Sequence, residues 1–150
     1  MHKFDRLLPP SFLLISLLLI LVLHFTIPIM SLVSTPYNYL GIFFIIFGGI
    51  MNIWTDLLFK KNNTNVKPDK MPAYLITDGP FKISRHPMYL GMFSILLGIS
   101  IFFGSLVTIF PLIIFIIIIE AKFIPLEEKN TEKIFNKKYK DYKRQVRRWI

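Results

Sequence analysis

The chain has 150 residues, about one domain by length, and 53% of them are hydrophobic, too many for a soluble domain that must cover its surface with polar groups. It contains no cysteine, so disulfides, thiolate metal sites and cysteine nucleophiles are excluded. The net charge of +9 would suit a nucleic acid, but the apolar residues fall in long blocks, as in membrane proteins. We therefore expect the basic residues to meet anionic lipid headgroups and expect no nucleic-acid partner.

Four apolar runs predict an all-α integral membrane protein that forms a single domain over residues 1–150. The first run is longer than the roughly 7–15 apolar residues of a signal peptide, so we expect it to be a retained span. The third run is short, and with the fourth it predicts a helical hairpin broken at Gly104-Ser105. The predicted membrane-spanning helices cover residues 13–33, 39–59, 88–103 and 106–124.

Polar residues inside the first two spans carry specific expectations. His24 has no acidic residue or second histidine nearby in the sequence, so we expect it to pack against neighbours or, together with Pro28, to mark a kink. Asn52 and Asp56 are four residues apart and share one helix face. This face is either a hydrated pair at the headgroups or the wall of an internal polar pocket.

Small residues form a stripe on the third span. Gly91, Ser94 and Gly98 follow one another at spacings of three and four. Such a stripe lets another helix or a ligand approach closely. We expect it to contact a neighbouring helix or to wall a portal through which a lipidic substrate enters.

The distribution of basic residues predicts the topology. Two of the 18 lie in the N-terminal leader, six lie in residues 60–87 and ten follow from Glu120 onward, whereas the turns at 34–38 and 104–105 hold none. Because basic residues stay on the cytoplasmic side, both termini and the long loop are expected there. Apolar positions at helical spacing in the tail predict one or two amphipathic helices on the membrane face. The compact size fits the plasma membrane of a prokaryote.

This topology brings two polar segments together, residues 73–91 and residues 120–150. The first carries Arg85, His86 and Tyr89, and the second carries Glu127 and Glu128. Carboxylates, an imidazole and aromatic rings at one surface can hold a small zwitterionic or cationic ligand. The alternative is structural, because Asp-Gly-Pro is turn chemistry and arginines, tyrosines and a glutamate pair commonly anchor a membrane interface. The three histidines are too scattered to predict a metal site.

Two blocks of the sequence resemble a known family. The first comprises Leu75-Ile-Thr-Asp-Gly-Pro-Phe81 and Arg85-His-Pro-Met-Tyr-Leu-Gly91, and the second comprises Leu126-Glu-Glu, Phe135-Asn-Lys-Lys-Tyr139 and Val146-Arg-Arg-Trp149. Together they resemble the isoprenylcysteine carboxyl methyltransferase family, whose wider group includes the phospholipid methyltransferases. The resemblance covers residues 73–150, about half of the chain, and the N-terminal spans match only in being hydrophobic.

The resemblance implies an integral membrane enzyme that uses S-adenosyl-L-methionine without a Rossmann-like domain. A prenylated or other lipidic substrate would enter from the bilayer and the cofactor from the cytoplasm. The implied cofactor-binding residues are Tyr74, Leu75, Ile76, Phe81, His86, Pro87, Met88, Tyr89 and Glu127. The residues expected to act on the acceptor are Arg85, Lys122 and Glu128, with Arg144 as a further candidate cation.

Three positions depart from the family pattern. Asn136 stands where the family has glycine, Arg147 stands where a proline is usual, and Phe123 stands where some carboxyl methyltransferases carry an arginine that holds the substrate carboxylate. Carboxyl O-methylation of an isoprenylcysteine-like acceptor is the leading interpretation. Methylation of a phospholipid amine, which would need His86 or a glutamate to take up a proton, is the alternative within enzymes. A non-enzymatic four-span transporter or adaptor is the alternative outside them.

Overall fold

The computed structural model describes residues 8–27, 31–64 and 71–150. Within these residues the regular structure is helical, apart from one isolated bridge between Ser31 and Ser105. This confirms the predicted all-α class. The α-helices are α1 (Pro9–Thr26), α2 (Leu40–Lys61), α3 (Pro87–Phe103), α4 (Ile109–Ile118) and α5 (Ile124–Gln145).

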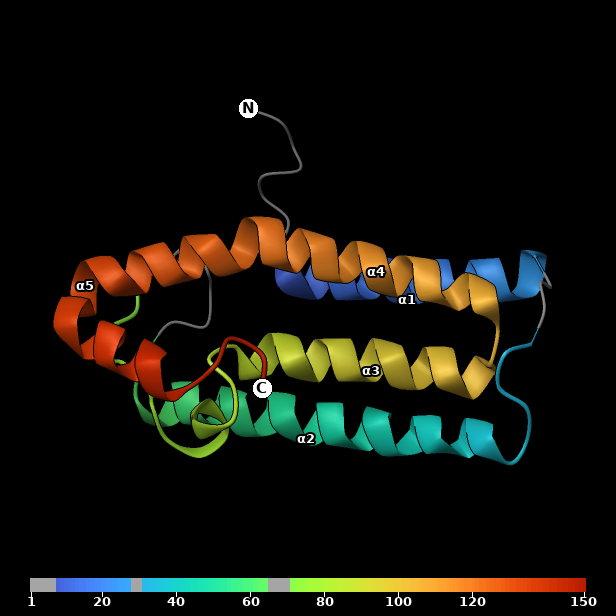
Figure 1. The fold of residues 1–150 in the computed structure, drawn as a ribbon, viewed down its shortest axis with the longest axis horizontal. Coiled ribbons are helices and arrows are strands. Elements are labelled where there is room, and N and C mark those ends of the chain that lie inside the picture. Colours follow the sequence, from blue (N-terminus) through green and yellow to red (C-terminus); the bar gives the residue numbers. More distant parts are fainter. Residues whose placement is uncertain (1–7, 28–30, 65–70) are drawn as a thin grey trace.

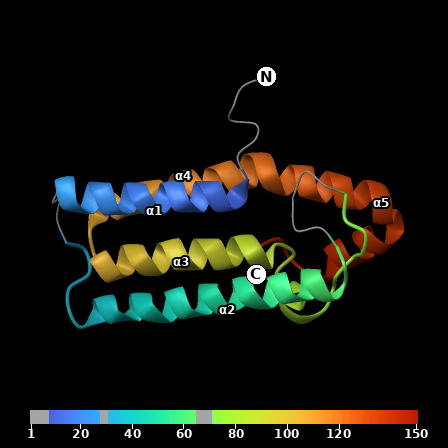
Figure 2. The same cartoon turned by 180° about the vertical axis from the view of Figure 1, so that it is seen from behind.

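The helices form an elongated bundle in which α3 runs antiparallel to α2, and α1 lies beside α4 (Figures 1 and 2). Apolar side chains of α1, α3 and α4 form the main core. At its centre Ile20, Leu96 and Phe115 are fully buried. Helix α5 continues beyond the bundle and then turns back, so the C-terminal residues lie beside the start of α3 (Figure 1).

The predicted spans are only partly confirmed. By length and composition, three helical segments of the described chain can cross a membrane: Pro9–Thr26, Tyr37–Lys61 and Leu106–Gln145. The 17-residue helix α3 is shorter, so a fourth crossing remains a prediction. The helix at the first predicted span, residues 13–33, runs from Pro9 to Thr26. Proline favours the first helical turn at Pro9, and Ile27, which precedes Pro28 in the sequence, leaves helical geometry.

The helix that forms the fourth predicted span does not end at residue 124. Helix α4 passes through a π-helical turn, Ile119–Phe123, directly into α5. Proline lacks an amide hydrogen and crowds the preceding turn of an α-helix, and the wider π-turn lies immediately before Pro125. The chain reverses instead at Asn136, whose backbone has a φ of 38° and a ψ of −107°. This conformation favours glycine, the residue of the family pattern at this position.

Glycines explain the close pairing of α2 and α3. A Cβ atom added to Gly48 would collide with the carbonyl oxygen of Gly91, and one added to Gly98 would collide with that of Gly41. The small-residue stripe of α3 therefore contacts a neighbouring helix, α2, which confirms the first of the two predictions made for it. The expectation that this stripe walls a lipid portal is wrong for Gly91 and Gly98, because α2 covers both.

The polar residues of the first two spans are also placed. The His24 ring stacks on Phe103 with a centroid distance of 4.4 Å, which confirms a packing role. Asp56 forms a partly exposed salt bridge of 2.6 Å with Lys60, as expected for a hydrated pair. Asn52 packs against Gly91 of α3. The leader up to residue 7, Pro28 and loop positions 65–70 lie outside the described residues.

Gly48→Ala should destabilise the bundle, because the new methyl group forces α2 and α3 apart at a backbone contact. We expect a cost of about 1–3 kcal/mol, as for other overpacked sites. Gly49→Ala is the matched control, since a Cβ there meets nothing within 4 Å. Thermal unfolding in detergent measures both variants. Equal melting temperatures would contradict the glycine contact.

Candidate functional site

The loop before α3 presents His86 at the end of the bundle. Thr64 anchors the loop, because its Oγ1 accepts hydrogen bonds from the amides of Ala73 and Tyr74. Gly79 has a φ of 61° and opens a short 3-10 turn over Gly79–Lys82. Proline restricts the residue before it, so His86 lies outside the helix that Pro87 begins.

The His86 imidazole lies between two carboxylates of α5. Its Nδ1 is 3.1 Å from Oε2 of Glu127, and its Nε2 is 3.4 Å from Oε1 of Glu128. Tyr89, one turn into α3, donates its hydroxyl to Oε1 of Glu127 over 2.5 Å. His86 is only 7% exposed. The prediction that residues 73–91 meet the tail is therefore confirmed, and the contact is direct.

Glu128 is the more firmly held of the two carboxylates. Arg85 Nη2 lies 3.0 Å from its Oε1, and Arg148 donates Nη2 to Oε2 at 3.0 Å and Nε to Oε1 at 3.3 Å. The second terminal nitrogen of Arg148, Nη1, lies 2.5 Å from Oε1 of Glu120. The sequence alone assigned no role to Arg148 or Glu120. Two features of the sequence could have pointed to them. Arg148 belongs to the Val146–Trp149 block, and Glu120 is an acidic residue at the end of an apolar run.

Burial and the carboxylates have opposite effects on His86. Burial disfavours the charged imidazole, but the hydrogen bonds and negative charges of Glu127 and Glu128 outweigh it and raise the pKa of His86 above its ordinary value of 6.5. A protonated ring donates from both nitrogens, which matches a carboxylate on each side. His86 is therefore better suited to organise the site as a cation than to accept a proton.

An apolar pocket adjoins the His86–Glu127 pair, between the start of α1, the end of α2 and the start of α3. Its volume of 110 Å³ far exceeds the ~10–15 Å³ that one water molecule needs, so it can admit part of a ligand. Polar groups reach it from Thr55, Arg85, His86 and Glu127. Its apolar walls comprise Leu8, Pro9, Pro10, Phe59, Phe81, Pro87, Met88 and Met92. Sequence analysis missed the contributions of α1 and of Thr55 and Phe59.

The predicted site residues divide among several places. The pocket is lined by seven of them: Phe81, Arg85, His86, Pro87, Met88, Tyr89 and Glu127. Tyr74 and Leu75 line a separate groove with Phe135 and Tyr142. Lys122 lines neither space, and its Nζ lies 5.8 Å from the centroid of the Phe123 ring. Arg85 and Glu128 are thus brought together, whereas Lys122 is not part of their cluster.

A second hydrophobic cluster fastens the loop to the returning half of α5. It contains Ile76, Phe81, Tyr139 and Tyr142, all less than 9% exposed. The Tyr142 hydroxyl donates a 2.6 Å hydrogen bond to the carbonyl oxygen of Phe81. Phe81 therefore links this cluster to the pocket, and Ile76 supports the site from outside it.

The pH dependence of stability tests the charged state of His86. A raised pKa means that the stabilising contacts of the imidazolium are fully present below about pH 6.5 and are lost as the pH rises through the folded-state pKa. The difference in melting temperature between the wild type and His86→Gln should therefore shrink with rising pH. Thermal melts from about pH 5 to about pH 9 measure it. A constant difference would contradict the assignment, and Asp78→Asn, which removes an exposed carboxylate of the same loop, serves as the control.

Comparisons with known proteins identify the family of the chain. The family model described as phospholipid methyltransferase matches residues 36–138, which include α2, α3 and both glutamates of the site. An uncharacterised protein of Haemophilus influenzae is 38% identical over 63 residues, which are 42% of this chain and 100% of that protein. No solved structure matches. The resemblance predicted from the two sequence blocks is confirmed, and the chain belongs to the phospholipid methyltransferase family of membrane methyltransferases.

Proposed function

We propose that the protein transfers a methyl group from S-adenosylmethionine to a lipidic acceptor in the pocket beside His86 and Glu127. The observation that carries this proposal is the position of the pocket. Apolar residues of three helices line it, and the charged cluster closes one side. A lipidic acceptor suits the apolar walls, and a charged cofactor suits the polar side.

The residues that line the pocket fit such a cofactor. Glu127 keeps a quarter of its side chain exposed at the pocket, and the rings of Phe81 and Tyr89 lie in the same lining. A carboxylate with aromatic neighbours attracts a cation such as a sulfonium and can accept hydrogen bonds from a ribose or an amine. The proposed cofactor-binding residues are Phe81, His86, Pro87, Met88, Tyr89 and Glu127. Tyr74, Leu75 and Ile76 are proposed to support the loop.

S-adenosylmethionine, when bound, supplies an electrophilic methyl group on a sulfonium. The chain itself has to hold the acceptor in line and to exclude water. Tyr89 and His86 fix the two oxygens of Glu127, so the carboxylate is oriented before any ligand arrives. Because His86 favours its protonated form, Glu127 is the better candidate to receive a proton from an acceptor.

The charges of the site favour an amine acceptor. Among the described residues, the cations that line the pocket are His86 and Arg85, and Glu128 already neutralises the Arg85 guanidinium at 3.0 Å. An acceptor carboxylate would also have to approach the negative charge of Glu127. Carboxyl methylation is the second candidate, supported by one observation: the Nε of Arg85 is buried and has no hydrogen-bond partner among the described residues.

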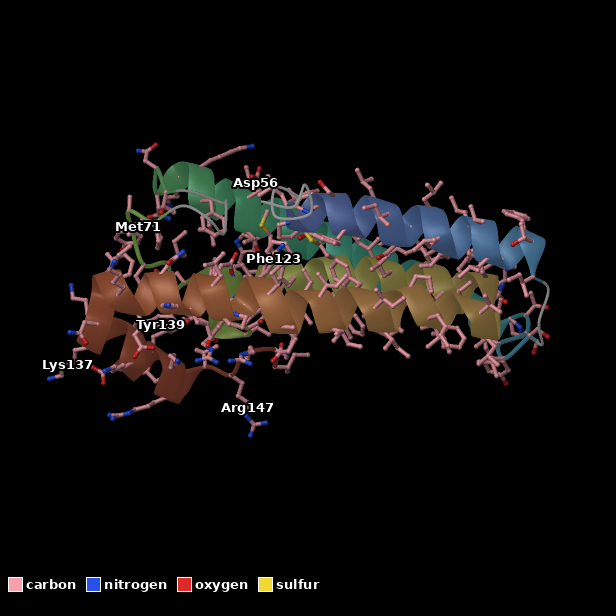
Figure 3. All side chains as sticks on the ribbon, turned by 90° about the horizontal axis from the view of Figure 1, so that it is seen from above. Asp56, Met71, Phe123, Lys137, Tyr139 and Arg147 are labelled. Atoms are coloured by element: carbon pink, nitrogen blue, oxygen red, sulfur yellow. The ribbon has the colours of Figure 1, made fainter. Side chains whose placement is uncertain are left out.

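The same geometry supports the proposed orientation in the membrane. The nitrogen-bearing side chains gather around α5 and the adjoining loop, whereas the rest of the bundle exposes mainly carbon (Figure 3). Leu8 and Pro9, at the start of α1, lie at this same end because they line the pocket. We propose that this end faces the cytoplasm, where basic residues are retained and the cofactor is available.

Cofactor binding tests the proposal directly. Calorimetry with S-adenosylhomocysteine should show binding by the purified protein, and Glu127→Gln should weaken it on the order of tenfold or more, since a charge-assisted contact is lost. Glu132→Gln removes a partly exposed carboxylate from the same helix and should bind as the wild type does. Equal affinity of the wild type and Glu127→Gln would remove Glu127 from the site.

The chemical stability of the product identifies the acceptor. Membranes containing the protein are supplied with S-adenosylmethionine that carries a labelled methyl group, and the extracted lipid is treated with base. We expect base-stable label, because an N-methyl group resists hydrolysis and a methyl ester does not. Base-labile label would contradict the amine and assign the reaction to a carboxylate held at Arg85.

A further inference from the structure

Residues 146–150 pass the start of α3 as an extended strap. Val146 leaves helical geometry with a φ of −123° and a ψ of 132°. The Arg147 carbonyl oxygen then accepts the amide of Arg85 at 3.1 Å, and the Arg148 carbonyl oxygen accepts the hydroxyl of Ser84 at 2.9 Å. Ser84 Oγ in turn accepts the amide of His86 at 3.1 Å. The strap therefore fixes the backbone that carries His86.

The Arg148 side chain joins two carboxylates from distant turns of the α4–α5 helix. Its Nε and Nη2 bind the two oxygens of Glu128, which is the bidentate geometry that guanidinium favours. Its Nη1 binds Glu120, whose other oxygen accepts the indole hydrogen of Trp149 at 3.0 Å. Both oxygens of each carboxylate are therefore engaged.

The π-turn makes this bridge possible. Glu120 and Glu128 are eight residues apart, so in an uninterrupted α-helix they would be offset by about 80° around the axis. The extra residue in the turn Ile119–Phe123 reduces this offset toward about 20°, which brings both carboxylates to the face where the strap passes. A π-turn inside a long helix often accompanies a functional site.

The bridge that Arg148 forms between Glu120 and Glu128 contacts the His86–Glu127 pair through Glu128. Oε1 of Glu128 faces Nε2 of His86, and Nδ1 of the same ring faces Glu127, which lines the pocket. The orientation of Glu128 therefore sets the orientation of the imidazole. Arg85 Nη2 lies 3.0 Å from Oε1 of Glu128, and Lys143 Nζ lies 3.8 Å from Oε2. Without Arg148, Oε2 of this buried carboxylate would lose its nearest partner and keep only the longer contact with Lys143 among the described ion pairs.

We propose that Arg148 is a positioning residue for methyl transfer, which locks Glu128 and, through it, the His86–Glu127 pair. This inference rests on the proposed function. Arg148 need not touch the acceptor or the cofactor, since it does not line the pocket. Its removal should reduce turnover much more than it weakens cofactor binding.

The experiment compares the wild type with Arg148→Ala, Arg148→Lys and Arg147→Ala, reconstituted in vesicles of phosphatidylethanolamine and phosphatidylglycerol. The Arg147 side chain points away from the bundle, so Arg147→Ala removes one charge from the strap without removing the bridge (Figure 3). We expect Arg148→Ala to lower kcat on the order of tenfold or more, as misplacement at an active site does, with little change in KM for S-adenosylmethionine. Arg148→Lys should recover only part of kcat, because lysine cannot form the two parallel hydrogen bonds that the guanidinium makes with Glu128.

A second measurement needs no turnover and keeps the inference separate from the proposed function. In protein with 15N-labelled histidine rings, both ring protons of His86 should be visible by NMR at a pH where the ring is protonated. Arg148→Ala should lose the Nε2 proton to solvent exchange while the Nδ1 proton, held by Glu127, persists. Arg147→Ala should retain both.

These outcomes separate the two claims. If the wild type neither transfers methyl groups nor binds S-adenosylhomocysteine, the proposed function is refuted. The NMR signals of the His86 ring protons would still test whether Arg148 positions Glu128 and His86. Retention of both protons in Arg148→Ala would overturn the positioning role. So would equal losses of kcat in Arg148→Ala and Arg147→Ala. If Arg148→Ala does not fold, the comparison of Arg148→Lys with Arg147→Ala decides, and wild-type kcat in Arg148→Lys overturns the inference.

Discussion

The contact of His86 with the two glutamates of α5 is the interaction on which this end of the molecule depends. Buried charges are stable only when each has a partner, and here the charges alternate: Arg148 and Arg85 hold Glu128, and Glu128 and Glu127 hold the imidazole. Loss of one member would leave its neighbours with fewer opposite charges in a buried place. The cluster therefore behaves as a unit that joins the loop, α3, α5 and the strap.

The rest of the fold delivers these groups to one place. Glycines bring α2 against α3, so that Thr55 and Phe59 reach the pocket from the neighbouring helix. The α4–α5 helix carries the glutamates past the end of the bundle, and the reversal at Asn136 returns the chain to the loop. Tyr142 then holds the Phe81 carbonyl, and the strap follows directly. Each of these contacts is local, but together they bring four segments of the chain around one pocket.

Sequence patterns predicted the parts of the site that lie in short contiguous blocks. Arg85, His86 and Tyr89 share one block, and Glu127 and Glu128 share another, so the charge topology was enough to place them together. The continuity of α4 with α5 was not predictable in the same way, because Pro125 is a normal helix-end signal and the π-turn that accommodates it leaves no sequence mark. The difference between the predicted first span and the bounds of α1 has a similar origin, since apolar residues continue past the end of α1.

Contacts between distant residues were also beyond sequence reasoning. Arg148 is one of ten basic residues in the tail, and nothing in its spacing distinguishes it from the exposed Arg147. Only the fold shows that it bridges Glu120 and Glu128. Tyr74 and Leu75 were the opposite case, because Phe81 and Arg85 of the same segment line the pocket, whereas these two residues line a separate groove.

A double-mutant cycle tests the central claim most directly. Binding of S-adenosylhomocysteine is measured by calorimetry for the wild type, His86→Ala, Glu127→Ala and the double variant. If the imidazole and the carboxylate act as one unit at the pocket, the two losses should be non-additive, with a coupling energy of about 0.5–3 kcal/mol, as for residues in contact. Strictly additive losses, or unchanged binding in all three variants, would contradict the account.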